Sequence, residues 1–204
     1  MGSRKTEIAP PAAGVVWGSA LWPRAPQAEW GLNALAGRMA EIRGGARLTA
    51  AMRLVWEAQQ RETPAAWIAG ADAFYPPDCA AGGVDLTALP VVHAPEERAA
   101  ARAADALLRS GGFGLIVADL AGDTGLPLAM QSRLAGLAKQ WGAALVCLTP
   151  GRRETISLAS LRAESWIVRR DFDAFGCVVR VTKDKRDAPG QREEEVRHGP
   201  GGLC

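Results

Sequence analysis

Short apolar runs alternate with helical segments along most of this chain, and this alternation restricts the possible fold more than any other feature. The clearest unit is a helix that begins near Pro95, carries Glu96 and Glu97 in its first turn and ends at Gly111. The continuous apolar run 113–119 follows it and has the length of a strand buried on both faces. Strands that alternate with helices form crossover units. We therefore expect an α/β fold, a mostly parallel β-sheet flanked by helices.

The rest of the pattern repeats this unit until the C-terminal part of the chain. There, 165–170 and 175–183 have the composition of two strands joined by a short turn, which predicts an antiparallel C-terminal hairpin at the sheet edge. The helix predicted at 127–141 places Leu128, Leu134, Leu137 and Trp141 on one side. The other predicted strands are 38–42, 65–69, 88–93 and 143–148, and the other predicted helices are 49–61 and 95–109.

Three segments of different character divide the chain. Residues 1–37 form an N-terminal arm in which prolines block a long helix. Its tryptophans, Trp17, Trp22 and Trp30, are anchors for docking either onto the chain's own domain or onto a partner. The core domain is expected over 38–189, and the polar residues 190–204 predict a flexible C-terminal tail.

Composition limits the functional class. The 204 residues are 48% hydrophobic, which suffices for one α/β domain. No apolar run approaches the roughly 20 residues that cross a bilayer, and the N-terminus lacks the apolar core of a secretion signal, so we expect a cytoplasmic protein with no membrane contact. The four cysteines and two histidines are widely separated, which disfavours a zinc site or a disulfide framework. Cys147 and Cys177 are predicted core residues, and His93 is predicted to be a half-buried structural histidine.

The turn after the first predicted strand has the layout of a phosphate-binding loop. Gly44 and Gly45 follow the strand, and Arg47 and Thr49 open the next helix, where backbone N–H groups and the helix dipole attract anions. In the full phosphate-loop motif, a later glycine, separated from the first by four residues, is followed directly by a lysine that reaches the outer phosphates. That later glycine and that lysine are both missing here. We therefore disfavour ATP and Mg²⁺ as cofactors and keep these four residues as the remnant of an anion site.

Two acids are weak catalytic candidates. Asp119 ends a buried run of the type that carries the magnesium-binding acid of nucleotide hydrolases, and Asp72 follows another predicted strand. An alternative is that Asp119 caps a turn with Gly122, since many parallel strands end in aspartate. Without the lysine, the two acids have no evident phosphate on which to act.

The C-terminal half is more basic than the rest of the chain. Between residues 151 and 192 the sequence contains ten basic and six acidic residues. This segment therefore has a charge of +4, in a chain of net charge +2. Such a surface favours contact with the phosphate backbone of DNA, although an ordinary solvated surface has a similar composition. The residues that we assign to DNA or partner binding are Arg152, Arg153, Arg169, Arg170, Lys183, Lys185 and Arg186.

In sequence order, these segments resemble the core of the RecA recombinase family. Residues 38–44 and 51–62 are similar to the strand and helix around its phosphate loop, and 66–72 to the strand that ends in the catalytic acid. Residues 115–119 resemble its second nucleotide-binding strand, and 179–185 the strand with paired lysines that approaches a neighbouring protomer's nucleotide. The resemblance covers 38–189 and implies a RecA-like fold.

The departures from that family point to one of its branches. Besides the phosphate-loop lysine, the chain lacks DNA-binding loops of recombinase length after Asp119 and after 143–148. Residues 74–77, 83–93 and 157–166 resemble the ImuA family, an accessory of bacterial mutagenic translesion synthesis. This resemblance implies action in the DNA-damage (SOS) response with DNA, RecA, an ImuB-type polymerase relative and a damage-induced replicative-type polymerase.

Three functions remain open from the sequence. The first is a non-catalytic RecA-like accessory of SOS mutagenesis that binds DNA and protein partners and modulates RecA. The second is a weak DNA-stimulated ATPase that uses Arg47, Thr49, Asp72 and Asp119. The third is a cell-division inhibitor similar to SulA, which would act on the FtsZ polymer.

Overall fold

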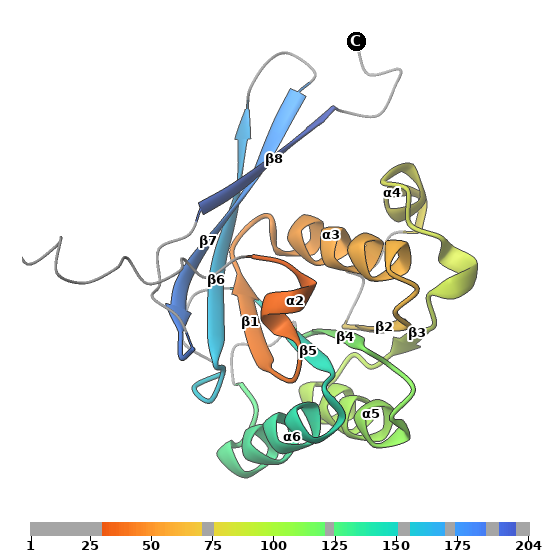
Figure 1. The fold of residues 1–204 in the computed structure, drawn as a ribbon, viewed down its shortest axis with the longest axis vertical. Coiled ribbons are helices and arrows are strands. Elements are labelled where there is room, and N and C mark those ends of the chain that lie inside the picture. The colour runs from red at the N-terminus through yellow and green to blue at the C-terminus, as the bar shows by residue number, and fades with distance from the viewer. Residues whose placement is uncertain are drawn as a thin grey trace, which may run out of the picture.

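A computed structural model describes residues 30–70, 76–120, 125–150, 156–169, 174–186 and 192–198. They form an eight-stranded sheet in the order β3-β2-β4-β5-β1-β6-β7-β8, flanked by helices (Figure 1). The strands are β1 (Met39–Arg43), β2 (Ala65–Ala69), β3 (Val91–His93), β4 (Leu115–Asp119), β5 (Ala144–Thr149), β6 (Leu161–Arg169), β7 (Ala174–Asp184) and β8 (Arg192–His198). The helices are α2 (Leu32–Leu35), α3 (Arg47–Gln60), α4 (Pro76–Ala81), the 3-10 helix η1 (Leu86–Ala88), α5 (Glu97–Ser110) and α6 (Leu128–Trp141).

The pairing of the strands confirms the α/β class and the parallel sheet. All ladders from β3 to β6 are parallel, whereas β6 and β7 form the predicted antiparallel hairpin. The hairpin does not lie at the sheet edge as predicted, because β8 pairs with the outer side of β7. α5 ends as predicted, because Gly111 adopts the left-handed conformation with φ of 66° and donates its N–H to the carbonyl of Leu108. The strand and helix boundaries differ from the predicted ones by a few residues.

The two faces of the sheet are covered by different helices. α3 lies on one face, and α5 and α6 lie on the other (Figure 1). Side chains alternate between the faces along each strand: in β4, Leu115 and Val117 pack with the core under α3, and Ile116 and Ala118 with the core under α5 and α6. This alternation places Asp119, the last residue of β4, on the α3 face.

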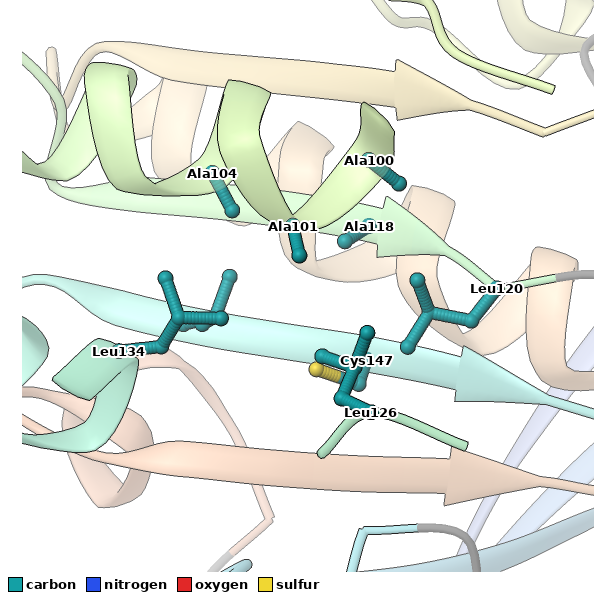
Figure 2. Close-up of a pocket in the computed structure, with 9 residues that line it drawn as sticks. Ala100, Ala101, Ala104, Ala118, Leu120, Leu126, Leu134 and Cys147 are labelled. Atoms are coloured by element: carbon teal, nitrogen blue, oxygen red, sulfur yellow. The ribbon is translucent and has the colours of Figure 1, made fainter. Parts of the chain in front are cut away.

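α5 approaches the sheet closely because its inner face is built from alanine. Ala100, Ala101 and Ala104 face β4 and β5, where they meet Leu134 of α6 and Cys147 of β5 (Figure 2). The gap that these side chains enclose has no room for a water molecule. The contact is therefore a dry, closely packed seam and not a ligand pocket.

Two differences from the sequence prediction concern the elements themselves. The predicted strand 88–93 begins only at Val91, because η1 occupies 86–88 and is capped by Asp85, which accepts the N–H of Thr87. Of the four side chains predicted on one side of α6, Leu134 is buried, whereas Leu128 and Trp141 are 61% and 48% exposed.

The two ends of the described chain contain more structure than the sequence indicated. Trp30, Leu32 and Leu35 lie within the expected arm 1–37, yet they are part of the core under α3. Residues 192–198 lie within the expected flexible tail and form β8, which pairs antiparallel with β7. Trp17 and Trp22 lie outside the described residues.

Candidate functional site

The turn between β1 and α3 is closed by β6. Only Gly44, Gly45 and Ala46 separate the strand from the helix. The Ala46 N–H donates to the carbonyl oxygen of Ser165 in β6 at 3.4 Å. A Cβ built on Gly44 would lie 2.1 Å from that same oxygen, so the backbone of β6 already occupies the space beside the turn.

Arg47 and Thr49 stand on the first turn of α3, at the helix end that attracts anions. The Nη1 atom of Arg47 donates to the carbonyl of Gly44 at 3.4 Å, and its Nε atom is buried without a hydrogen bond. A phosphate cradle requires several backbone N–H groups that converge on empty space. Here the Ala46 N–H already has a partner and the space beside Gly44 is filled, although the space beside Gly45 is open, so the turn fits poorly the nucleotide phosphates that bind at this position in nucleotide hydrolases.

Asp119 lies near Arg47 at the carboxyl end of the sheet. Its side chain is 99% buried, and neither carboxylate oxygen has a hydrogen-bond partner. Burial raises the pKa of this carboxyl, and the positive charge of Arg47 only partly opposes the rise. The metal role that the position of Asp119 at the end of β4 indicates stays a prediction.

The other residues of the predicted acid site do not lie within the described part of the chain. Asp72 and Gly122 lie outside the described residues, which leaves both the pairing of Asp72 with Asp119 and the proposed turn cap as predictions. His93 is exposed at the end of β3, so the prediction that it is half-buried is wrong. Across the described ranges, no group of three or more His, Cys, Asp or Glu side chains is arranged to hold a metal ion.

The described members of the predicted basic set do not form one patch. Arg169 lies opposite Phe175 at the outer end of the β6–β7 hairpin, whereas Lys183 lies opposite Arg162 near its inner end. Seven residues of strand separate these positions, a distance of about 24 Å. Lys185 and Arg186 follow Lys183 and are exposed, and Arg152, Arg153 and Arg170 lie outside the described residues.

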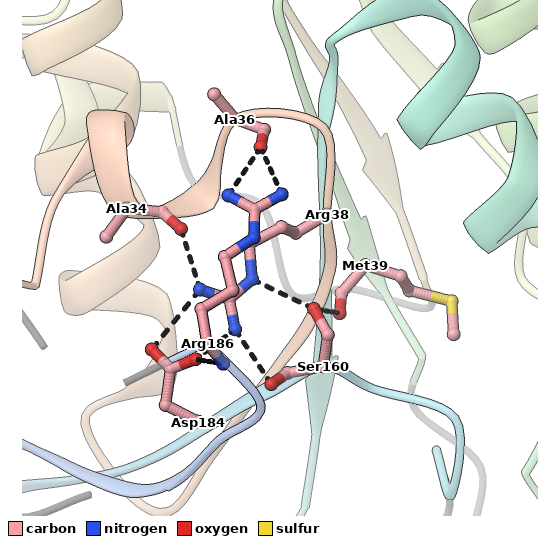
Figure 3. A network of polar contacts seen from close by, with 7 residues as sticks. All are labelled: Ala34, Ala36, Arg38, Met39, Ser160, Asp184 and Arg186. Atoms are coloured by element: carbon pink, nitrogen blue, oxygen red, sulfur yellow. Dashed lines mark hydrogen bonds and ion pairs between the residues drawn. The ribbon is translucent and has the colours of Figure 1, made fainter. Parts of the chain in front are cut away.

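The inner basic group is fastened to the N-terminal part of the domain (Figure 3). Arg38 makes a buried two-pronged ion pair with Asp184 and also donates to the carbonyl of Ser160 at 2.8 Å. Arg186 donates from two nitrogens to the carbonyl of Ala36 at 3.4 Å. Asp184, which lies between Lys183 and Lys185 in the sequence, is therefore neutralised by Arg38 and fixes the end of β7 against β1 and β6.

One buried ion pair was not anticipated from the sequence. Glu41 of β1 accepts a hydrogen bond from Arg162 of β6 at 2.5 Å and another from Thr149 of β5 at 3.0 Å. Glu41 is fully buried and Arg162 is 4% exposed. Arg162 therefore adds nothing to the basic surface, although it contributes to the charge of +4 counted from the sequence. The only sequence signal was an acid in the middle of an apolar strand.

The outer half of the hairpin combines arginines with exposed apolar side chains. Glu164 accepts hydrogen bonds from Arg43 at 2.6 Å and from Arg180 at 2.8 Å, and these two arginines hold the pKa of its carboxyl below the usual range. Further out, Ile167 and Phe175 are 48% and 39% exposed. Neither apolar residue stands out in the sequence, because each occurs in a run that is typical of a buried strand.

The cysteines behave as core residues, as predicted for Cys147 and Cys177. Both are buried, as is Cys79. Burial, aided by the nearby charge of Glu41, raises the pKa of the Cys147 thiol to about 12. Such a thiol is not a nucleophile at neutral pH.

Comparison with known proteins identifies the fold of the chain. Neither protein-family models nor curated proteins match the sequence. Among solved structures, the chain is similar to the crystal structure of the RadB recombinase, with a TM-score of 0.61 and 11% identity over 78% of this chain and 87% of that one. An identity this low shows the fold alone, and that fold is RecA-like, as predicted. In the described residues, no helix is long and apolar enough to cross a membrane.

Proposed function

We propose that this chain is a non-catalytic RecA-like accessory protein that binds DNA and a protein partner without using a nucleotide. The observation that carries the proposal is the closed β1–α3 turn. The carbonyl oxygen of Ser165 accepts the Ala46 N–H and packs against Gly44, so it occupies the space that a phosphate would need there. A nucleotide-independent role then has to act through surfaces.

The finer assignment rests on the resemblance to ImuA. On that basis the proposed setting is mutagenic translesion synthesis in the SOS response, in the cytoplasm. The proposed protein partners are RecA, an ImuB-type polymerase relative and a damage-induced replicative-type polymerase. Modulation of RecA would follow from a RecA-like domain that competes for, or caps, a filament.

The proposed DNA contacts are the basic residues of the C-terminal half. In the described part of the chain, Arg169, Lys185 and Arg186 are exposed and Lys183 is half-buried. Because these positions lie at the two ends of the hairpin, DNA that touches both groups has to run along the hairpin. Arg152, Arg153 and Arg170 remain members of the proposed set.

A salt series tests this proposal. Binding of the full-length chain to fluorescent single-stranded and duplex DNA is measured by anisotropy as the salt concentration rises. Each lost phosphate contact lowers the salt slope on single strands by about 0.7, so Lys183→Ala/Lys185→Ala should lower it by about 1.4. Arg98→Ala/Arg102→Ala removes the same charge from exposed positions of α5 and serves as the control. An unchanged slope, or an equal loss in both variants, contradicts the proposed surface.

The ATPase alternative retains one supporting observation, the position of Asp119 near Arg47 at the carboxyl end of β4. If the chain hydrolyses ATP through this acid, phosphate release should rise with DNA and disappear in Asp119→Ala. Release at background level, or release that survives the substitution, removes this alternative.

A further inference from the structure

β6 continues well beyond the strand with which it pairs. Its ladder with β1 covers only residues 161–164, yet β6 extends to Arg169. Figure 1 shows the outer ends of β6 and β7 reaching past the end of β1 and past α3. In the part of the chain that the structure describes, no strand pairs with this side of β6 after Glu164. Although β6 lies between β1 and β7 in the sheet, its outer part is paired on one side only and therefore has the open edge of an edge strand.

The orientation of Ser165 shows which backbone groups lie at this edge. Its carbonyl oxygen points away from β7, because it accepts the Ala46 N–H from the turn after β1. Successive residues of a strand direct their N–H and C=O groups to opposite sides, so alternate residues share a direction. The N–H and C=O of Ile167 consequently also point away from β7, toward the line that β1 would follow if it were longer.

Apolar side chains accompany this open edge. Ile167 lies opposite Cys177 and Arg169 lies opposite Phe175, so Ile167 and Phe175 are diagonal neighbours on one face of the hairpin. They are 48% and 39% exposed. Proteins usually protect a long edge strand with charge, proline or a covering element, because an exposed apolar edge invites another strand to pair. Here a large apolar side chain, Ile167, stands on the edge itself.

The charges near the edge favour an acidic partner. Arg43 and Arg180 share a single carboxylate, that of Glu164, so this group of three side chains carries a net positive charge. Arg43 lies where an added strand would begin, and Arg169 lies where it would end. An added strand with acidic residues at both ends would complement both positions.

We propose that the outer edge of β6, from Trp166 to Arg169, binds an extended peptide segment of a partner protein by strand addition. The segment carries apolar side chains at alternate positions, which pack on Ile167 and Phe175, and acidic residues at its ends. Main-chain hydrogen bonds supply the affinity and the alternate side chains supply the specificity. The inference rests on the proposed function in one respect, because it supplies the surface through which an accessory protein would hold its partner.

A peptide-binding experiment tests this surface in the full-length chain. The probes are synthetic, fluorescent seven-residue peptides with valine, isoleucine or phenylalanine at alternate positions and glutamate at both ends, and binding is measured by anisotropy. Versions methylated on alternate backbone nitrogens lose the hydrogen bonds of a strand and should bind at least about tenfold more weakly. Versions with lysine at both ends should also bind more weakly. Failure of every acidic peptide, or equal binding of the methylated forms, overturns the proposal.

Matched variants locate the binding on the protein. Ile167→Ser should weaken peptide binding about tenfold, because it removes the apolar anchor. Leu128→Ser removes a more exposed leucine from α6 and should leave peptide binding unchanged. Equal effects of the two substitutions contradict the proposed edge. DNA binding of the unsubstituted chain separates the two proposals: a chain that binds DNA but no acidic peptide rejects the strand-addition site, and a chain that binds the peptide but no DNA rejects the basic surface.

Hydrogen exchange distinguishes a partner peptide from a covering segment of the same protein. The Ile167 amide of the free full-length chain should exchange rapidly and should become protected when the peptide binds. Protection in the free chain at every concentration means that residues 1–29 or another part of the chain already cover the edge. Protection that rises with protein concentration means that a second copy covers it. Either result overturns the proposed occupant.

Discussion

Replacing Gly44 with alanine tests how tightly the β1–α3 turn is closed. Gly44 has a φ of 105°, and a Cβ at this position would lie 2.1 Å from the carbonyl oxygen of Ser165. A contact this short with a backbone atom cannot be relieved by rotating a side chain, so the turn or β6 has to move. Gly45 is a matched control, because a Cβ there meets nothing within 4 Å.

The expected loss follows from two effects. An alanine held in a left-handed backbone conformation costs about 1–2 kcal/mol, and forcing an additional carbon into a filled space costs about 1–3 kcal/mol. Gly44→Ala should therefore lower the free energy of unfolding by about 2–5 kcal/mol. Gly45→Ala should change it by less than about 1 kcal/mol, and a small gain is possible because alanine restricts the unfolded chain.

Urea unfolding of the two variants and the parent chain measures the difference. With a slope of about 2 kcal/mol per molar urea, Gly44→Ala should shift the midpoint by about 1–2.5 M. If the space beside Gly44 were open, only the strain of the left-handed backbone would remain, about 1–2 kcal/mol. A midpoint shift below about 1 M, or equal midpoints for the two variants, would therefore refute the closed turn.

Four further predictions concern stability and reactivity. Glu62 has a φ of 53°, so Glu62→Gly should raise the free energy of unfolding by about 1 kcal/mol in urea melts. Glu41→Gln leaves a buried arginine without its counter-charge and should cost about 3–5 kcal/mol, whereas Asp105→Asn, whose partner arginine is largely exposed, should cost less than about 1 kcal/mol. The Cys147 thiol, with its pKa raised to about 12, should resist alkylation at pH 8 until urea unfolds the chain. Burial raises the pKa of Asp119 in the folded state, so the folded state binds more protons than the unfolded state. The contribution of Asp119 to the free energy of unfolding therefore falls as pH rises from about 4 through the raised pKa. Asp119→Asn should accordingly stabilise the chain at about pH 7.

Each of these predictions has a contradicting result. A loss of stability in Glu62→Gly would mean that its side chain supports the end of α3 more than its backbone conformation costs. Equal losses in Glu41→Gln and Asp105→Asn would contradict the difference in burial. Rapid native-state labelling of Cys147, or a Asp119→Asn variant that is less stable than the parent at pH 7, would contradict the stated effects of burial.

Local chemistry made much of the fold predictable. Gly111 ends α5 because glycine accepts the left-handed conformation, and the apolar run 115–119 has the length and composition of a buried parallel strand. The start of β3 could also have been found, because Asp85 and Thr87 have the spacing of a capped turn. β8 could not, because its sequence is mostly charged and only its pairing with β7 makes it a strand.

The candidate sites depend more on long-range contacts. Nothing local pairs Glu41 with Arg162, which lies 121 residues further along the chain. The sequence after Gly44 shows that the phosphate-loop lysine is missing. The oxygen that closes the turn, however, belongs to Ser165 in β6, far along the chain from Gly44. The same holds for the open edge at Ile167, since a strand that outruns its neighbour is a property of the sheet and not of either strand alone.

The most direct test of the central claim is DNA binding by the full-length chain with and without ATP and Mg²⁺, measured by anisotropy across a salt series. The closed turn predicts binding that weakens as salt rises and has the same affinity in the presence and absence of ATP. Binding that requires ATP, or that tightens when ATP is added, would contradict the account, because it would mean that the turn at Gly44 accepts a nucleotide.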